Sequence, residues 1–341
     1  MKIGIICPSD IAFRRFLPAL STIDEIDFVG VGINTPEERY GDNYPNAEVV
    51  ELMLKNERQK AQNMIDIFGG TVFDSYSSIV SSSEIDAIYI PLPPALHHCW
   101  AKKALECGKH VLVEKPSTTT YEDTLELVTT ASKNGLALHE NYMFIFHSQL
   151  DVINNIVNSG EIGEVRLYRI SFGFPMRAAN DFRYNRSLGG GALLDAGGYT
   201  IKYASYLLGD TAKVMYAQLN NLKSFEVDMY GSGALVNEDG VTAQIAFGMD
   251  NEYKCELEVW GSKGILINGR VLTAPAGFEP TANIIKNGKK ETVPLPADDA
   301  FRKSINRFTY CIKDKEVREK NYSLLLRQAE LVQSFMDLAK R

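Results

Sequence analysis

With 341 residues the chain is long for one hydrophobic core, so its length indicates two domains. Hydrophobic residues at 45% and charged residues at 23% are typical of a water-soluble globular protein, and no apolar run is long enough to span a membrane. The formal net charge of −7, with no basic block to offset it, argues against a protein that binds nucleic acid.

The cysteines indicate neither a disulfide framework nor a metal site. They are odd in number and lack the spacing of metal ligands, so we expect reduced thiols. The positions are Cys7, Cys99, Cys107, Cys255 and Cys311. The first residues already read as a strand, with no signal peptide before them, and we therefore expect a cytoplasmic protein.

The first half of the chain alternates short apolar strands with longer segments of helical periodicity. This pattern predicts an α/β fold in which helices wrap a parallel sheet. Strands are expected at residues 3–6, 28–33, 87–90, 111–113 and 137–140, and helices at 13–22, 47–68, 97–107 and 122–134. We assign residues 1–120 to a Rossmann dinucleotide-binding domain.

The second half reads as consecutive strands without crossover helices, which predicts a large open sheet of mixed or antiparallel strands. These strands are expected at residues 165–174, 214–220, 227–235, 241–249, 256–260 and 265–267. Helices at 199–208 and 322–339 complete an α+β domain over residues 121–341 for substrate binding and oligomerisation. We expect the last helix to pack back on the first domain.

The turn after the first strand is the expected site of a dinucleotide pyrophosphate. Cys7, Ser9 and Ala12 occupy the positions of the small residues in the dinucleotide fingerprint, with two of its glycines replaced. Ser9 can cap the helix or hydrogen-bond a phosphate, and Asp10 and Ile11 complete the turn. The segment fits an ordinary strand–turn–helix equally well, so both interpretations stay open.

No carboxylate directly follows the second strand, where NAD enzymes bind the adenosine ribose. Asn34 and Thr35 stand there instead, and Arg39 follows. These residues suit a 2′-phosphate, so we expect NADP(H) to be favoured over NAD(H). The segment at residues 40–56 looks like an insertion that can cover this site.

A proline-rich turn after the strand at residues 87–90 forms a rigid wall for a flat ring. Pro91 and Leu92 are expected cofactor contacts. His97 can reach the cofactor ribose or the substrate, and the alternative is a plain surface histidine.

Lys115 stands at the carboxyl end of a buried strand, in the sequence Glu114-Lys115-Pro116. Ligands bind at these strand ends in open α/β sheets, so Lys115 is expected to face the cofactor and substrate. Glu114 is expected to orient Lys115 or to contact the nicotinamide ribose. Tyr199, in a glycine-rich segment, forms with Lys115 a plausible proton-delivery pair for reducing a carbonyl.

Several motifs occur together in the order and spacing of one family. They lie at residues 2–20, 91–97, 110–116, 140–143, 159–163 and 189–199. The chain thereby resembles the glucose–fructose oxidoreductase/inositol dehydrogenase/rhizopine catabolism (Gfo/Idh/MocA) family over nearly its whole length. Residues 12–20, 91–94, 140–142 and 181–184 are most similar to the nucleotide-sugar 3-ketoreductases of deoxysugar biosynthesis.

The resemblance implies a Rossmann domain followed by a domain with a large open mixed sheet that makes homodimer or homotetramer contacts. Two departures affect the expected activity. Many members that oxidise polyols have histidine where this chain has Tyr199, whereas the sugar 3-ketoreductases have tyrosine. Cys7 and Ser9 replace glycines that many members keep.

In the expected reaction a hydride reaches a carbonyl carbon and Tyr199 supplies the proton. Free tyrosine has a pKa of about 10, and the cation of Lys115 favours the phenolate left after transfer. Tyr142 and Asp195 are expected substrate contacts, with core packing and helix capping as their alternatives. Arg183 and Asn141 are expected cofactor contacts. The alternative for Arg183 is binding a phosphate, and the alternative for Asn141 is binding the sugar.

The preferred function is therefore NADP(H)-dependent reduction of a keto group, at C3, of a nucleotide-linked sugar. One alternative is a dehydrogenase of a free sugar, an inositol or a dihydrodiol. A second is a non-catalytic NAD(P)-binding sensor, against which the retention of both Lys115 and Tyr199 argues, because a sensor needs no proton donor.

Overall fold

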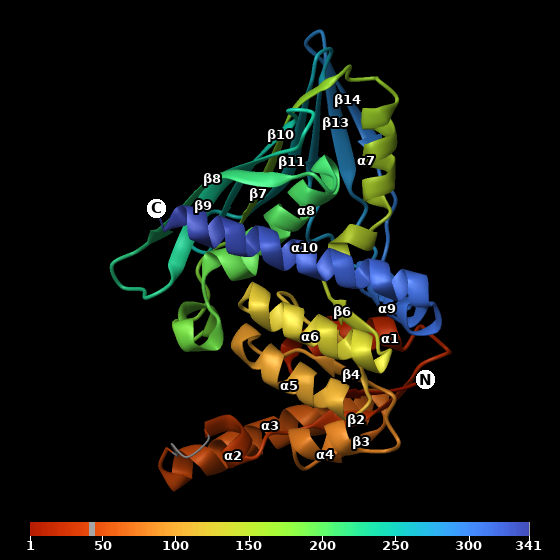
Figure 1. Cartoon of the computed structure of the whole chain (residues 1–341), viewed down its shortest axis with the longest axis vertical. Helices are drawn as coiled ribbons and strands as arrows, with labels where there is room; N and C mark the ends of the chain where they lie inside the picture. Colours follow the sequence, from red (N-terminus) through yellow and green to blue (C-terminus); the bar gives the residue numbers. More distant parts are fainter. Residues whose placement is uncertain (41–44, 341) are drawn as a thin grey trace. The chain divides into compact units, whose positions relative to one another are not determined.

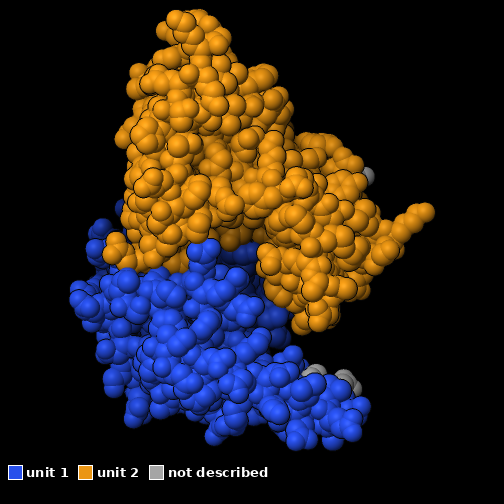
Figure 2. Space-filling view, turned by 180° about the vertical axis from the view of Figure 1, so that it is seen from behind, with its two compact units in different colours: residues 1–118, 122–141, 305–325 blue, residues 119–121, 142–304, 326–341 orange. Residues whose placement is uncertain are grey.

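The computed structural model describes residues 1–40 and 45–340, and residue contacts group the chain into two compact units. Unit 1 consists of Met1–Thr118, Glu122–Asn141 and Ile305–Leu325, and unit 2 of Thr119–Tyr121, Tyr142–Ser304 and the residues from Leu326 onward. Figure 2 colours the two units. Part of the insertion expected at residues 40–56 lies outside the described residues. The domain boundary expected near residue 120 stays a prediction.

Unit 1 contains a sheet of six parallel strands in the order β3-β2-β1-β4-β5-β6 (Figure 1). The strands are β1 (Lys2–Ile5), β2 (Asp27–Gly32), β3 (Thr71–Phe73), β4 (Ala87–Ile90), β5 (His110–Val113) and β6 (Leu138–Glu140). This is the strand order of a doubly wound Rossmann sheet, so the expected fold class is confirmed for this part of the chain. The sequence pattern missed β3, which has three residues, none of them fully buried.

The following helical segments lie wholly or partly in unit 1. They are η1 (Ala12–Phe16), α1 (Leu17–Leu20), α2 (Pro36–Tyr40), α3 (Ala47–Phe68), α4 (Tyr76–Ser81), α5 (Pro94–Glu106), α6 (Tyr121–Asn134), α9 (Ala300–Lys313) and α10 (Lys315–Ala339). The first helix is divided into a π-helical turn and a short α-helix, with Pro18 near the start of α1. Proline lacks an N–H donor, which fits its place in a first helical turn.

The part of α10 that belongs to unit 1 contacts the β6 side of the sheet. Asn321 Nδ2 donates to the carbonyl oxygen of Leu138 at 2.6 Å, and the Tyr322 hydroxyl donates to the carbonyl oxygen of Leu136. These bonds join residues that are more than 180 positions apart in the sequence. They explain why Ile305–Leu325 groups with the N-terminal sheet.

Unit 2 contains a sheet of eight strands in the order β14-β13-β12-β11-β7-β10-β9-β8. The strands are β7 (Val165–Gly173), β8 (Lys213–Asn221), β9 (Asp228–Val236), β10 (Thr242–Gly248), β11 (Lys254–Gly261), β12 (Ile265–Gly269), β13 (Thr281–Lys286) and β14 (Lys289–Pro294). Only β7 and β10 pair in parallel among these strands, so the expected mixed sheet is confirmed.

Unit 2 also contains helical segments, of which the last two pack on its sheet. They are η2 (Met143–Phe146), α7 (Gln149–Asn158), η3 (Phe182–Tyr184), η4 (Arg186–Leu188), η5 (Leu193–Gly197) and α8 (Gly198–Leu208). The helix α8 packs on β7 and β10 (Figure 1). Residues 142–146 alternate as a strand does, but the chain forms a 3₁₀ turn there that buries Phe144.

Two kinds of feature are absent from the described residues. No helix there is both long enough and apolar enough to cross a membrane. No group of three or more histidine, cysteine, aspartate or glutamate side chains in the same residues is placed to hold a metal ion.

Candidate active site

The turn between β1 and η1 is closed by its own serine. Ser9 Oγ accepts a hydrogen bond from the Ala12 N–H at 3.2 Å, so Ser9 acts as a helix cap. Burial, and then the charge of Glu57, raise the pKa of the Cys7 thiol to about 12, which keeps the thiol neutral. Asp10, in the same turn, lies 4.0 Å from the Lys60 ammonium. Ile11 directly precedes the π-helical turn.

At the carboxyl end of β2 the structure supplies a carboxylate that the local sequence lacks. Glu57, from α3, accepts the Asn34 N–H at 3.2 Å and the Arg39 guanidinium at 2.9 Å. Asn34 is 6% exposed, and its Oδ1 has no hydrogen bond to a described residue. A buried acceptor without a partner at this strand end fits the hydroxyls of an adenosine ribose. The residues present therefore fit a dinucleotide.

Thr35 serves as a helix cap. Its N–H donates to Glu38 Oε2 at 3.1 Å, and its hydroxyl accepts the Glu38 N–H at 3.2 Å. The Glu38 carboxylate also accepts the N–H groups of Tyr76 and Ser77 at the start of α4. The predicted phosphate contact of Thr35 stays a prediction.

Polar side chains at the ends of β4, β5 and β6 form a buried network around Glu114. Its Oε1 accepts the Tyr89 hydroxyl at 2.7 Å and Asn141 Nδ2 at 2.6 Å. Burial raises the pKa of Glu114, opposed by these two hydrogen bonds and by the nearby charge of Lys115. The structure thus brings together Glu114 and Asn141, and Lys115 follows β5 by two residues.

His97 is fully buried, so the alternative of a plain surface residue is wrong. Its Nδ1 lies 2.7 Å from the Pro116 carbonyl oxygen and its Nε2 lies 2.7 Å from the Leu92 carbonyl oxygen. Its ring therefore joins the turn after Lys115 to the proline-rich turn that contains Pro91. The cofactor contacts expected of these two turns stay predictions.

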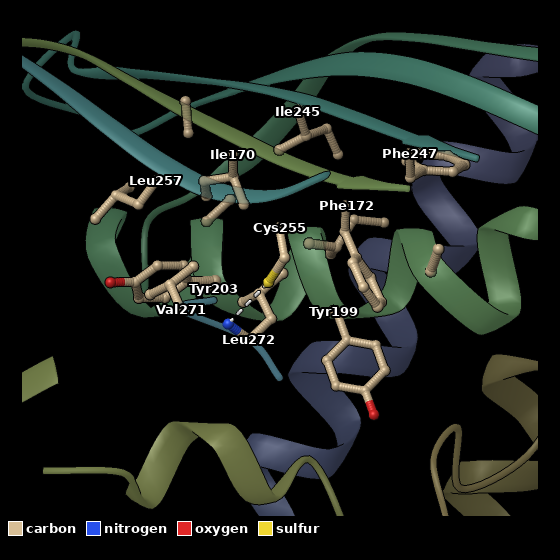
Figure 3. Packing of buried hydrophobic residues seen from close by; sticks show 14 of the residues in the cluster. Ile170, Phe172, Tyr199, Tyr203, Ile245, Phe247, Cys255, Leu257, Val271 and Leu272 are labelled. Atoms are coloured by element: carbon tan, nitrogen blue, oxygen red, sulfur yellow. Dashed lines mark hydrogen bonds between the residues drawn. The ribbon is translucent and has the colours of Figure 1, made fainter. Parts of the chain in front are cut away.

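Tyr199 lies in a cluster of aromatic rings within unit 2. Its ring centroid is 5.2 Å from that of Tyr142, 5.3 Å from that of Phe172 and 5.6 Å from that of Phe144. In Figure 3 the ring stands beside Phe172 and the hydroxyl points away from the sheet. Tyr199 is 9% exposed. The ring is fixed by packing, whereas its hydroxyl lies at the end turned away from the sheet.

The glycine-rich segment before Tyr199 is needed for this packing. A β-carbon at Gly198 would overlap the Tyr142 hydroxyl. Another at Gly190 would overlap the Arg183 carbonyl oxygen. These close approaches leave no room for a larger residue at either position.

Arg183 and Asp195 form an ion pair, with Arg183 Nε donating to Asp195 Oδ2 at 2.7 Å. Asp181 Oδ1 accepts from the same guanidinium at 3.1 Å. Burial lowers the pKa of Arg183, but the two carboxylates raise it more, so the guanidinium stays charged. The alternative that Asp195 caps the helix is wrong, because Asp195 lies inside η5 and Asp228 accepts the Leu193 N–H at 2.7 Å.

Three residues near these groups were missed by the sequence analysis. Glu57 and Asp228 reach their positions through tertiary contacts and have no local signal. Lys202 does have a local signal in the sequence, since it lies three positions after Tyr199 on α8 and therefore on the same helix face. Its ammonium is 5.7 Å from the centroid of the Tyr142 ring.

The candidate residues divide between the two units. Lys115 and the other predicted residues up to Asn141 belong to unit 1. Tyr142, Arg183, Asp195 and Tyr199 belong to unit 2.

Comparison with known proteins identifies the family. Residues 25–142 match the model of the oxidoreductase family with an NAD-binding Rossmann fold, and residues 151–267 match the GFO/IDH/MocA C-terminal domain. The chain is 34% identical to the dTDP-3,4-didehydro-2,6-dideoxy-alpha-D-glucose 3-reductase of Saccharopolyspora spinosa, over 98% of this chain and 96% of that protein. It is 36% identical to the enzyme of that name from Actinomadura kijaniata, over 97% of this chain and 93% of that protein.

Solved structures agree with the sequence comparison. A 3-ketoreductase from Actinomadura kijaniata, in complex with NADP and TDP-benzene, matches with a TM-score of 0.88 and 35% identity over 99% of this chain and 97% of that one. Structures of its variants, with a tyrosine changed to phenylalanine or a lysine changed to alanine, also match. The resemblance expected from the motifs is confirmed, and the chain belongs to the Gfo/Idh/MocA family of oxidoreductases.

Proposed function

We propose that the chain reduces the C3 keto group of a nucleotide-linked sugar with NADP(H). The observation that carries this proposal is the likeness to the 3-reductases over almost the whole length of both chains. In the Actinomadura enzyme the substituted lysine and tyrosine are 84 residues apart, and Lys115 and Tyr199 have the same separation.

NADPH, when bound, supplies the hydride that the carbonyl carbon accepts. Tyr199 donates its phenolic proton to the carbonyl oxygen, which completes the alcohol, and water later returns a proton to the phenolate. Lys115 stabilises the negative charge that grows on the oxygen and then on the phenolate. Because the aromatic rings around Tyr199 fix its direction, little reorganisation accompanies the proton transfer.

The remaining site residues have supporting roles in this proposal. Glu114 and Asn141 hold the ribose side of the nicotinamide, a role supported by their mutual hydrogen bond. Asp195 binds sugar hydroxyls with its orientation fixed by Arg183, which is supported by their ion pair. The preference for NADP(H) is supported by the NADP in the related complex and by the cation of Arg39 near the end of β2.

Association into a homodimer or homotetramer in the cytoplasm is also part of the proposal. Aromatic residues are exposed on the face of the unit 2 sheet opposite its buried side: Tyr216 is 53% exposed, Tyr230 41% and Trp260 40%. Exposed apolar groups of this kind favour contact with another protein surface. Sedimentation of a monomer at micromolar concentration would contradict this part.

The test is consumption of NADPH with an enzymatically generated dTDP-3-keto-hexose, comparing the wild type with Tyr199→Phe. We expect the variant to lose about 10²–10⁴-fold in kcat with nearly unchanged NADPH affinity, because only proton donation is removed. Tyr206→Phe, on the same helix, is the matched control and should keep its activity. A Tyr199→Phe variant with most of its activity would remove Tyr199 from the acid role.

No oxidation of NADPH by a wild type that still binds it would contradict the substrate assignment. A dehydrogenase of a free sugar, an inositol or a dihydrodiol would then be recognised by NADP⁺ reduction with those alcohols. A sensor would bind the cofactor and turn over none of them.

A further inference from the structure

The carboxyl end of β2 contains two kinds of group that Rossmann proteins normally use in alternation. A carboxylate there accepts the 2′-hydroxyl of NAD(H), whereas an arginine accommodates the 2′-phosphate of NADP(H). This chain has Glu57 and Arg39 at that place, and they are bonded to each other at 2.9 Å.

Glu57 is placed as a ribose-binding carboxylate although it comes from α3. Its Oε2 accepts the Asn34 N–H two residues beyond the end of β2, and its side chain is only 14% exposed. The same bond fixes Asn34, whose Oδ1 has no hydrogen bond to another described residue. Two acceptor groups at one strand end suit hydroxyl donors better than a phosphate, which has only oxygen acceptors at neutral pH.

The cations around Glu57 offset its repulsion of a 2′-phosphate, so the carboxylate does not exclude NADP(H). The side chain of Arg39 is 40% exposed, so its guanidinium can turn toward an incoming anion, and the charge of Lys60 lowers the pKa of Glu57. Burial raises the pKa of Glu57, opposed by the hydrogen bond from Asn34 and by the charges of these two cations. The site therefore contains charges of both signs, and Glu57 is the buried negative one.

We propose that Glu57 determines cofactor specificity by limiting the preference for NADPH, so that the chain favours NADPH over NADH only modestly. The inference deepens the proposed function and rests on it. When NADH binds, Glu57 accepts the ribose 2′-hydroxyl while Arg39 keeps its ion pair. When NADPH binds, Arg39 turns from Glu57 to the 2′-phosphate, and the carboxylate opposes the phosphate charge.

The test is fluorescence titration of NADH and NADPH, without any sugar, against the wild type and Glu57→Gln. We expect the wild-type dissociation constant for NADPH to be lower than that for NADH, but by no more than about tenfold. In Glu57→Gln the ratio of the NADH dissociation constant to the NADPH dissociation constant should rise by about tenfold or more. The substitution removes a charge-assisted hydrogen bond to NADH and removes the repulsion of the 2′-phosphate of NADPH. Glu51→Gln, exposed on the same helix, is the control for lost charge and should keep the wild-type ratio.

Arg39→Gln keeps the proposal testable if Glu57→Gln unfolds. It should weaken NADPH binding by about tenfold and leave NADH binding within about twofold. An unchanged ratio in a folded Glu57→Gln, or equal weakening of both cofactors in Arg39→Gln, would overturn the role of Glu57 while the proposed function stands. Failure of the wild type to bind either cofactor would overturn both.

Discussion

The two units hold their proposed reactive side chains by different physical means. In unit 1 the turn that contains Lys115 is held by buried polar contacts. The His97 ring lies between two backbone carbonyl oxygens, one of which accepts its N–H, and Tyr89 and Asn141 donate to Glu114. In unit 2 Tyr199 is held by ring packing. The stability of a buried polar network depends on the protonation of its members, whereas that of an aromatic cluster depends on the volume of the side chains packed in it. The two regions should therefore fail under different perturbations.

The energetic reason for this difference is the effect of losing one partner. A buried polar group left without its partner costs about 1–3 kcal/mol, so a network is sensitive to each member. An aromatic contact adds about 0.5–1.5 kcal/mol beyond area burial, and a cluster loses it only when the rings move.

In unit 1 the largest effect is expected at Lys115, the functional group that its polar network presents. Lys115→Met removes the cation that stabilises developing negative charge, so kcat should fall by about 10²–10³-fold, or about 3–4 kcal/mol. The free energy of unfolding should change little, since Lys115 is half-buried at the end of β5. Steady-state kinetics and urea unfolding separate the two readouts, with Lys133→Met, exposed on α6, as the control. A loss of less than fivefold in kcat would remove Lys115 from the charge-stabilising role.

His97 makes the network pH-dependent. Burial lowers its pKa to about 4, and although its carbonyl partners favour a protonated ring, burial is the larger effect. The unfolded chain takes up a proton near pH 6.5 but the folded chain does not, so acidification favours unfolding between pH 6.5 and 4. The wild type should lose about 3 kcal/mol of stability more than His97→Gln does between pH 7 and 4.

The measurement for His97 is urea unfolding of both proteins at several pH values. The difference in unfolding free energy should shrink on acidification. A difference that grows instead would mean that His97 is protonated in the folded chain, with both ring nitrogens donating to the carbonyls of Leu92 and Pro116. Acidification would then stabilise the unit 1 network instead of destabilising it.

Gly198→Ala tests the volume limit of the aromatic cluster. Alanine in a helix normally stabilises by about 0.5–1 kcal/mol relative to glycine. Here its β-carbon overlaps the Tyr142 hydroxyl, so we expect a loss of about 1–3 kcal/mol that does not depend on pH. Gly269→Ala, where a β-carbon has no neighbour within 4 Å, is the control for urea unfolding. A stabilised Gly198→Ala would show that Tyr142 can move away.

The sequence predicted those parts of the molecule whose causes are local. The apolar periodicity gave the parallel sheet, and the run before Lys115 correctly predicted that it follows β5. Strand β14 was missed because it is exposed at nearly every position and has no apolar alternation. Strand β13 was missed as well, and only two of its six residues are buried. Contacts across long separations were missed for a different reason. Nothing at Glu57 marks its bond to Asn34, 23 residues earlier, and nothing at His97 marks its bond to Pro116.

The smallest effect is expected at Lys202, the charged member of the aromatic region. Its ammonium lies over the Tyr142 ring and on the same helix face as Tyr199, so it adds an electrostatic contribution to a site otherwise held by packing. At the partly exposed surface this cation contributes about 1 kcal/mol or less to the stability of a phenolate. Lys202→Met should therefore lower kcat by up to about fivefold, while Lys213→Met, an exposed lysine on β8, leaves kcat unchanged. A loss as large as that of Lys115→Met would mean that unit 2 also depends on a charge, and that packing alone does not prepare Tyr199 for proton transfer.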